Sequence, residues 1–121
     1  MILKRLECEF AICQVADFSN VDLSRPFHFV ARTDEECSLV CPAADVPEGV
    51  LARDGGWRAF RIEGVLDFSL IGILARISSL LAQNQIGIFA VSTYNTDYIL
   101  TKAENYDRAL QALADDGWDI L

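Results

Sequence analysis

Two short polar segments in the second half of the chain carry residue types that could bind a small zwitterion. The first, residues 67–72, leads from Asp67 into a run of apolar residues with helical spacing. The first backbone N–H groups of a helix are unpaired and favour an anion such as a carboxylate. The second segment, residues 93–97, ends on Asp97, whose carboxylate could hold an ammonium or guanidinium group. Together the two segments predict a binding site for an amino acid.

Both aspartates also have structural interpretations. Asp67 is a plausible N-cap of the helix, in which case a ligand contact would be its secondary role. Asn95, Thr96 and Asp97 are turn-forming types, and Asp97 could instead accept hydrogen bonds from its own backbone. On the residues alone this structural interpretation of Asp97 is favoured. Arg76, roughly two helical turns into the helix, is interpreted as a solvated or interface charge.

No catalytic or metal-binding pattern stands out in the sequence. His28 is the only histidine, and no serine or cysteine lies at a spacing that would make it a catalytic base. The spacings of the four cysteines match no standard zinc motif, and the preferred interpretation is small apolar strand residues: Cys8, Cys13, Cys37 and Cys41. We therefore predict no enzyme activity, no metal and no cofactor.

The composition limits the class of protein. A chain of 121 residues with 52% apolar and 23% charged residues is typical of a globular protein with one domain or two very small ones. The net charge of −8 argues against nucleic-acid binding, which needs a basic surface. No apolar run approaches the roughly 20 residues of a membrane span, and the N-terminus lacks the apolar core of a signal peptide. These features predict a cytoplasmic protein.

The hydrophobic pattern predicts an α+β fold. The expected strands are residues 7–16, 27–32, 37–41, 57–63, 86–93, 97–102 and 118–121, the expected helices 68–84 and 104–116. Residues 42–56, rich in proline and glycine, are expected to connect rather than pack. From residue 57 the order is β-α-β-β-α-β, the ferredoxin-like arrangement with both helices on one face of an antiparallel sheet. The first half follows the same plan with shortened helices, which indicates a weak internal duplication and two regions, 1–56 and 57–121.

Apolar residues at helical spacing predict which faces are buried. In the first helix these are Leu70, Ile73, Leu74, Ile77, Leu80 and Leu81, with Asn84 as the C-terminal stop. In the second helix they are Tyr106, Ala109, Leu110 and Leu113, and Gly117 is expected to end the helix.

Several of these residues resemble the ACT domains, small ferredoxin-like modules that sense amino acids. Gly72, within Leu70-Ile-Gly-Ile-Leu-Ala-Arg-Ile, matches the family's glycine at the start of the first helix, and Ile86-Gly-Ile matches its second strand. The common Asp-x-Pro-Gly turn is replaced by Asp67-Phe-Ser-Leu-Ile-Gly, two residues longer and without proline. Asp-Phe-Ser-Leu, the segment from Ser92 to Leu100 and Cys41-Pro resemble a bacterial subgroup with tandem ACT-like halves. That subgroup is similar to the eukaryotic cytosolic arginine sensors.

The resemblance covers residues 57–121 well and the first half loosely. It implies an ACT domain preceded by a degenerate ACT-like half, and a ligand held between two ACT units of a homodimer. One unit would offer the turn and the other the hairpin, which makes Asp97 a favoured ligand contact. The predicted ligand-binding residues are Asp67, Phe68, Ser69, Leu70, Ile71, Gly72, Thr93, Tyr94, Asn95, Thr96 and Asp97. The implied ligand is a free amino acid, slightly favoured to be cationic, and the signal would pass to a downstream protein.

Other functions of the same fold are less favoured. An interaction module with a vestigial ligand site is the main alternative. A hydrolase of the acylphosphatase type would need an arginine in its anion-binding loop, and residues 67–72 contain none. RNA binding is opposed by the negative charge and by strands that lack the aromatic pattern of RNA-binding sheets.

Overall fold

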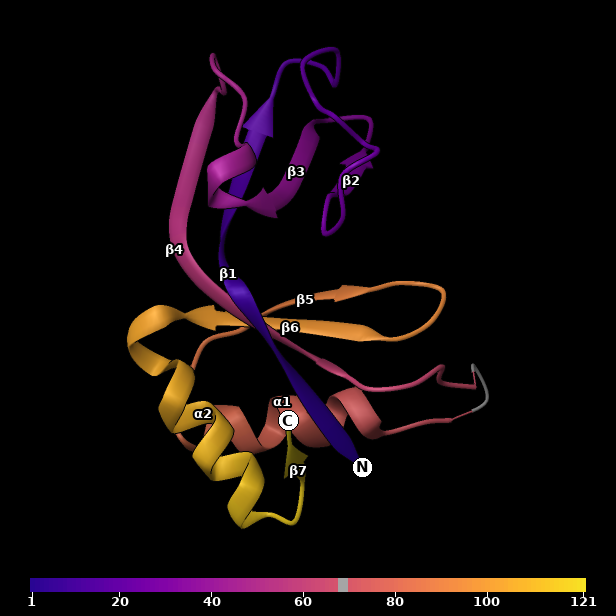
Figure 1. The fold of residues 1–121 in the computed structure, drawn as a ribbon, viewed down its shortest axis with the longest axis vertical. Helices are drawn as coiled ribbons and strands as arrows, with labels where there is room; N and C mark the ends of the chain where they lie inside the picture. The colour runs from indigo at the N-terminus through magenta and orange to yellow at the C-terminus, as the bar shows by residue number, and fades with distance from the viewer. Residues whose placement is uncertain (68–69) are drawn as a thin grey trace. The chain divides into compact units, whose positions relative to one another are not determined.

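The structure, a computed structural model, describes residues 1–67 and 70–121 (Figure 1). The chain divides into two compact units. Unit 1 contains residues 1–7 and 58–121, and unit 2 contains residues 8–57. Strands β1 (Ile2–Val15) and β4 (Ala52–Ile62) are both longer than predicted, and each contributes residues to both units.

Unit 1 is a sheet with the strand order β7-β1-β4-β6-β5, on which two helices pack. Its remaining elements are α1 (Ile73–Gln83), β5 (Phe89–Ser92), β6 (Asp97–Lys102), α2 (Ala103–Asp115) and β7 (Asp119–Ile120). From β4 onward the predicted β-α-β-β-α-β order is confirmed, and both helices lie on the same side of the β5–β6 hairpin (Figure 1). Beyond the prediction, the start of β1 lies between β7 and β4, where Ile2 and Leu3 pair in parallel with β7.

The core of unit 1 lies between the sheet and the two helices. The predicted buried face of α2 is confirmed, since all four of its predicted residues are buried: Tyr106, Ala109, Leu110 and Leu113. They pack with Phe60 and Ile62 of β4 and with Ile77 and Leu81 of α1. The hydroxyl of Tyr106 donates a hydrogen bond of 2.6 Å to the carbonyl oxygen of Ala59. This bond ties α2 to the strand at the centre of the sheet.

Helix α1 begins later than the sequence predicted. Its N-cap is Gly72, with φ 86° and no side-chain cap, so the assignment of Asp67 as N-cap is wrong. The left-handed backbone at Gly72 stops the helix from extending toward residue 68, because the helix needs a negative φ at every position. Leu70 consequently lies outside the helix and is 53% exposed, while Ile77 and Leu81 are buried as expected. At the other end, Asn84 is the C-cap, as predicted.

Unit 2 is a smaller sheet with the order β2-β3-β1-β4. Its further elements are β2 (Phe29–Arg32), β3 (Cys37–Pro42) and the 3-10 helix η1 (Ala43–Asp45). The predicted hairpin of β2 and β3 is confirmed. The predicted connector, residues 42–56, is wrong over its last five residues, which belong to β4. Leu51 donates its backbone N–H to the carbonyl of Gln14 in β1. This long-range bond holds the chain beside β1 directly before β4 begins.

Cysteines contribute to the core of unit 2. All four are free thiols, and Cys13 and Cys41 are buried beside Ala11, Val15 and Leu39, in agreement with their interpretation as small apolar residues. Burial raises the pKa of Cys41 to about 11, so this thiol is protonated at neutral pH. Within residues 1–67 and 70–121 no group of side chains is arranged to hold a metal ion. No helix in the same ranges is long and apolar enough to cross a bilayer.

The Tyr106 hydroxyl predicts a measurable contribution to stability. Replacing it by Tyr106→Phe removes the buried bond to Ala59, and we expect the free energy of unfolding to fall by about 1–2 kcal/mol. Urea denaturation followed by circular dichroism measures this change. The control is Tyr94→Phe, on a ring that is 78% exposed, where we expect a change below about 0.5 kcal/mol. Equal midpoints for both variants would contradict the prediction.

The left-handed backbone of Gly72 can be tested in the same way. A Cβ at this position would meet no atom within 4 Å, so the cost of Gly72→Ala lies in the backbone alone. We expect a net loss of about 1 kcal/mol, since the left-handed strain exceeds the gain from a stiffer unfolded chain. Gly87→Ala is the matched control, because its Cβ also meets no atom and its φ is not left-handed. Its stability should be unchanged or slightly higher in the same denaturation measurement.

Candidate functional site

A cavity of about 230 Å³ in unit 1 brings the two predicted segments together. The residues in its wall come from the segment before α1, from the first turn of α1 and from the β5–β6 hairpin: Leu66, Asp67, Leu70, Gly72, Ile73, Leu74, Ala75, Ser92, Thr93, Tyr94, Asn95, Thr96 and Asp97. The backbone N–H of Leu66 donates to the carbonyl oxygen of Asn95 at 2.7 Å and holds the two segments against each other. The turn and the hairpin of one chain therefore border one cavity, whereas the resemblance implied that the two segments would come from two different units.

The first turn of α1 forms one wall of this cavity. Gly72 and the next three residues, Ile73, Leu74 and Ala75, all line it. The first hydrogen bond inside the helix runs from the N–H of Arg76 to the carbonyl of Gly72, and Gly72 provides no side-chain cap. In the part of the chain that the structure describes, the three intervening N–H groups have no acceptor. This end of α1 carries the positive end of the helix dipole and favours an anion.

The hairpin turn on the opposite wall is closed by its own threonines. Thr93 donates its N–H and its hydroxyl to the carbonyl of Thr96, both at 2.9 Å. In return the N–H of Thr96 donates to the Thr93 hydroxyl at 3.3 Å. The Thr96 hydroxyl, in a residue that is 5% exposed, donates to the carbonyl of Ile62 at 2.7 Å. These two predicted site residues therefore shape the wall: the Thr93 hydroxyl closes the turn, and the Thr96 hydroxyl ties the turn to β4.

Asp97 is different, because its carboxylate is not used by the turn. It begins β6, its backbone is paired with Ser92, and its side chain is half-buried in the cavity wall. Over residues 1–67 and 70–121, no hydrogen bond or ion pair to this carboxylate is present. A carboxylate without a partner at the edge of a cavity suits a cationic group, since a charge-assisted hydrogen bond would satisfy it. Thr93, rather than Asp97, closes the turn.

The other predicted residues are placed as follows. Phe68 and Ser69 lie outside the described residues. Tyr94 is on the rim of the cavity, and Ile71, 91% exposed, lines a separate cavity of about 170 Å³ beside Trp118. Arg76 is 67% exposed and makes an ion pair of 3.6 Å with Asp116, in agreement with its interpretation as a surface charge.

Sequence reasoning missed part of the cavity wall. Those residues are Leu66, Ile73, Leu74, Ala75 and Ser92. A signal for three of them was present, because glycine directly before an apolar helical run is an accepted N-cap. Starting the helix after Gly72 would have placed the first-turn N–H groups at Ile73, Leu74 and Ala75.

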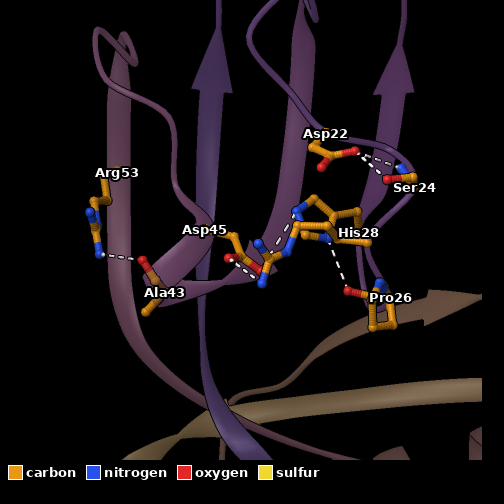
Figure 2. Close-up of polar contacts among 8 residues, drawn as sticks. Asp22, Ser24, Pro26, His28, Ala43, Asp45 and Arg53 are labelled. Carbon is orange, nitrogen blue, oxygen red and sulfur yellow. Dashed lines mark hydrogen bonds and ion pairs between the residues drawn. The ribbon is translucent and has the colours of Figure 1, made fainter.

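His28 belongs to a structural cluster in unit 2 (Figure 2). Its Nδ1 donates to the carbonyl oxygen of Pro26 at 2.9 Å, and its Nε2 lies 4.0 Å from a carboxylate oxygen of Asp45. The other oxygen of Asp45 pairs with Arg25 at 3.4 Å. The imidazole is 2% exposed, so these contacts fasten the loop before β2 to η1.

The chain matches the model of the ACT domain over residues 52–115, which is more than half of its length. Among solved structures it is similar to a protein from Agobacterium tumefaciens, with 32% identity and a TM-score of 0.86. The match covers 98% of this chain and 90% of that one. No curated protein matches the chain.

More distant solved structures share the fold alone. A protein of unknown function from Vibrio cholerae, described as a possible transport protein, is 21% identical, with a TM-score of 0.72 over 94% of this chain and 88% of that one. A structure of aspartokinase α and β subunits is 15% identical, with a TM-score of 0.70 over 95% and 96% of the two chains. The family model, the ferredoxin-like order from β4 and the glycine that begins α1 all agree. The chain belongs to the ACT domain family, whose modules regulate rather than catalyse.

Proposed function

We propose that the cavity of unit 1 binds a free amino acid and that this binding has a regulatory role. One observation carries the proposal: an uncapped helix end and a carboxylate without a partner border the same cavity. An amino acid presents a carboxylate and an ammonium group a few ångströms apart, and these two features offer a partner for each. The α-carboxylate would accept hydrogen bonds from the first turn of α1, and the ammonium group would donate to Asp97.

The size and the lining of the cavity support a small amphipathic ligand. At about 230 Å³ it is smaller than the roughly 300–1,000 Å³ of sites for drug-sized molecules, which favours a single amino acid over a nucleotide. Leu66, Leu70, Ile73 and Leu74 provide apolar surface for the ligand's side chain. Asp67 adds a second carboxylate to the wall, which slightly favours a cationic side chain.

Regulation by such a ligand requires only that it binds two states of the protein with different affinity. The similar structures include an aspartate kinase from Clostridium acetobutylicum described as an allosteric enzyme. For this chain we propose a homodimer in the cytoplasm, in which a second ACT unit covers the open side of the cavity and a downstream protein receives the signal. Support comes from the apolar rim, where Leu70 and Tyr94 are 53% and 78% exposed. No catalysis by this chain is expected.

The same exposed rim supports one alternative function. An interaction module could use Leu70, Ile71 and Tyr94 to dock a partner while the cavity itself stays unused. The two functions differ in the role of Asp97. A pure docking module keeps its partner and its oligomeric state when this carboxylate is removed.

Calorimetric titration with each of the twenty standard L-amino acids tests the proposal. We expect at least one to bind with a dissociation constant below 1 mM, an affinity above about 4 kcal/mol. Asp97→Asn should weaken this binding by about 10- to 100-fold, because a hydrogen bond to a charged group contributes roughly 1.5–3 kcal/mol. Asp107→Asn is the matched control: it makes the same change of charge on the exposed face of α2 and should leave the affinity unchanged.

Two results would contradict the proposed function. One is the absence of binding by any of the twenty amino acids to the folded wild-type chain. The other is binding that Asp97→Asn and Asp107→Asn weaken equally, since the effect would then come from net charge rather than from the site.

A further inference from the structure

The two units are built on two copies of one sequence pattern. Residues 10–19 read Phe-Ala-Ile-Cys-Gln-Val-Ala-Asp-Phe-Ser, and residues 60–69 read Phe-Arg-Ile-Glu-Gly-Val-Leu-Asp-Phe-Ser. Six of these ten positions are identical, fifty positions apart, and they include the whole Asp-Phe-Ser segment. A second pair of stretches, residues 29–43 and 89–103, shares its first phenylalanine, its turn threonine and its final alanine, sixty positions apart.

The structure shows that the second pair of stretches folds in the same way. In unit 2 Phe29 pairs with Val40 and Arg32 with Cys37, and in unit 1 the register is the same sixty positions later. The N–H of Thr33 donates to the carbonyl of Glu36 at 2.9 Å, and the N–H of Glu36 donates to the Thr33 hydroxyl at 3.1 Å. This is the hydrogen-bonding pattern of the turn that Thr93 closes.

The strand order of the two units agrees as well. Unit 2 has the order β2-β3-β1-β4, and unit 1 has β5-β6-β4-β1, with β7 added at the end. In each unit the second strand of the hairpin, β3 or β6, therefore lies next to the first strand of that copy, β1 or β4. The weak duplication expected from the sequence is thus visible in the pairing of the strands.

The copies differ at the helix that begins the site. Between the two stretches unit 1 has ten more residues than unit 2, and this is the region where α1 forms. Unit 2 has no helix there, and the residue fifty positions before Gly72 is Asp22. The Asp22 carboxylate accepts hydrogen bonds from the N–H and the hydroxyl of Ser24 (Figure 2), so it satisfies a local turn. Unit 2 therefore lacks the uncapped helix end.

The copies also differ at the carboxylate to which we assign the ligand's ammonium group. Cys37 occupies the position of Asp97, and it packs against the apolar cluster of unit 2. The counterpart of Asp67 in this copy, Asp17, accepts hydrogen bonds from the N–H and the hydroxyl of Ser19. These bonds lower the pKa of Asp17 and show that its charge is already satisfied inside the turn.

We propose that the chain binds one amino acid, in unit 1, and that Gly72 and Asp97 determine this specificity, because unit 2 has neither the uncapped helix end that Gly72 begins nor a carboxylate at the position of Asp97. The residues that both copies share, Thr93 and its counterpart Thr33, position the turn and do not select the ligand. In unit 2 the Asp17 and Asp22 carboxylates are instead hydrogen-bonded within their own turns. This inference rests on the proposed function, because it assigns the ligand of that same cavity to one copy.

The test is calorimetry on the full-length chain with the standard L-amino acid that binds the wild type most tightly. We expect one molecule bound per chain. Asp97→Cys, which introduces the residue of unit 2, and Asp97→Asn should each lower the affinity at least tenfold. Asp17→Asn and Asp22→Asn should leave the affinity within twofold of the wild type, provided that circular dichroism shows both variants folded at the temperature used.

Gly72 is tested by a pair of variants of equal shape. Asparagine and aspartate both tolerate a left-handed backbone, so Gly72→Asn and Gly72→Asp differ in charge alone. We expect Gly72→Asp to bind at least tenfold more weakly than Gly72→Asn, because its carboxylate would occupy the end of α1 that accepts the ligand's carboxylate.

The possible results separate the two proposals. Two molecules per chain would overturn the inference and leave the proposed function intact. The same holds if Asp17→Asn weakens binding as much as Asp97→Cys, or if the two Gly72 variants bind equally. Failure of all twenty amino acids to bind the wild type would overturn the proposed function and the inference together.

Discussion

The left-handed backbone at Gly72 is the constraint on which the site depends. A helix that continued backwards from Ile73 would pair the first-turn N–H groups with carbonyls of its own preceding turn. Because Gly72 adopts φ 86°, the helix stops there, and its first turn lines the cavity without a side-chain cap. The turn before the helix is then free to approach the hairpin, where Leu66 bonds to Asn95.

Some polar groups around the cavity are hydrogen-bonded within the protein and hold its wall in place, while others are left for a ligand. A buried polar group without a partner is costly, and the Thr96 hydroxyl avoids this cost by donating to the carbonyl of Ile62. The Thr93 hydroxyl finds its partner inside the turn, in the carbonyl of Thr96. The helix end on one side of the cavity and the Asp97 carboxylate on the other are both accessible enough to be solvated before a ligand arrives. Leaving these two groups without protein partners therefore lowers the free energy of unfolding only slightly.

The two copies show how chain length changes the outcome of a shared pattern. Phe-x-Ile-x-x-Val-x-Asp-Phe-Ser precedes a helix in unit 1 and an irregular loop in unit 2. A loop with ten fewer residues has no room for three helical turns before the next strand. In unit 2 the apolar cluster is covered from loops instead, by Phe18 and Val21 in the region where α1 forms in unit 1, and by Val46 and Val50 after β3.

Local pattern determined a large part of this protein. Alternation and helical spacing are properties of neighbouring residues, so the order of elements from β4, the buried face of α2 and the cap at Asn84 were all readable from the sequence. The same is true of the two segments that border the cavity, since a polar turn before an apolar run and an acidic hairpin are local features.

Tertiary structure decided the rest, because the rest depends on contacts between residues far apart in the chain. No local pattern shows that Ile2 and Leu3 pair with β7, or that Leu51 joins Gln14 and draws a glycine-rich segment into a strand. The start of α1 was misjudged for the same reason: Asp67 has the chemistry of an N-cap, but the bond from Leu66 to Asn95 and the backbone of Gly72 place the helix five residues later. Only the folded chain could therefore show that both segments border one cavity.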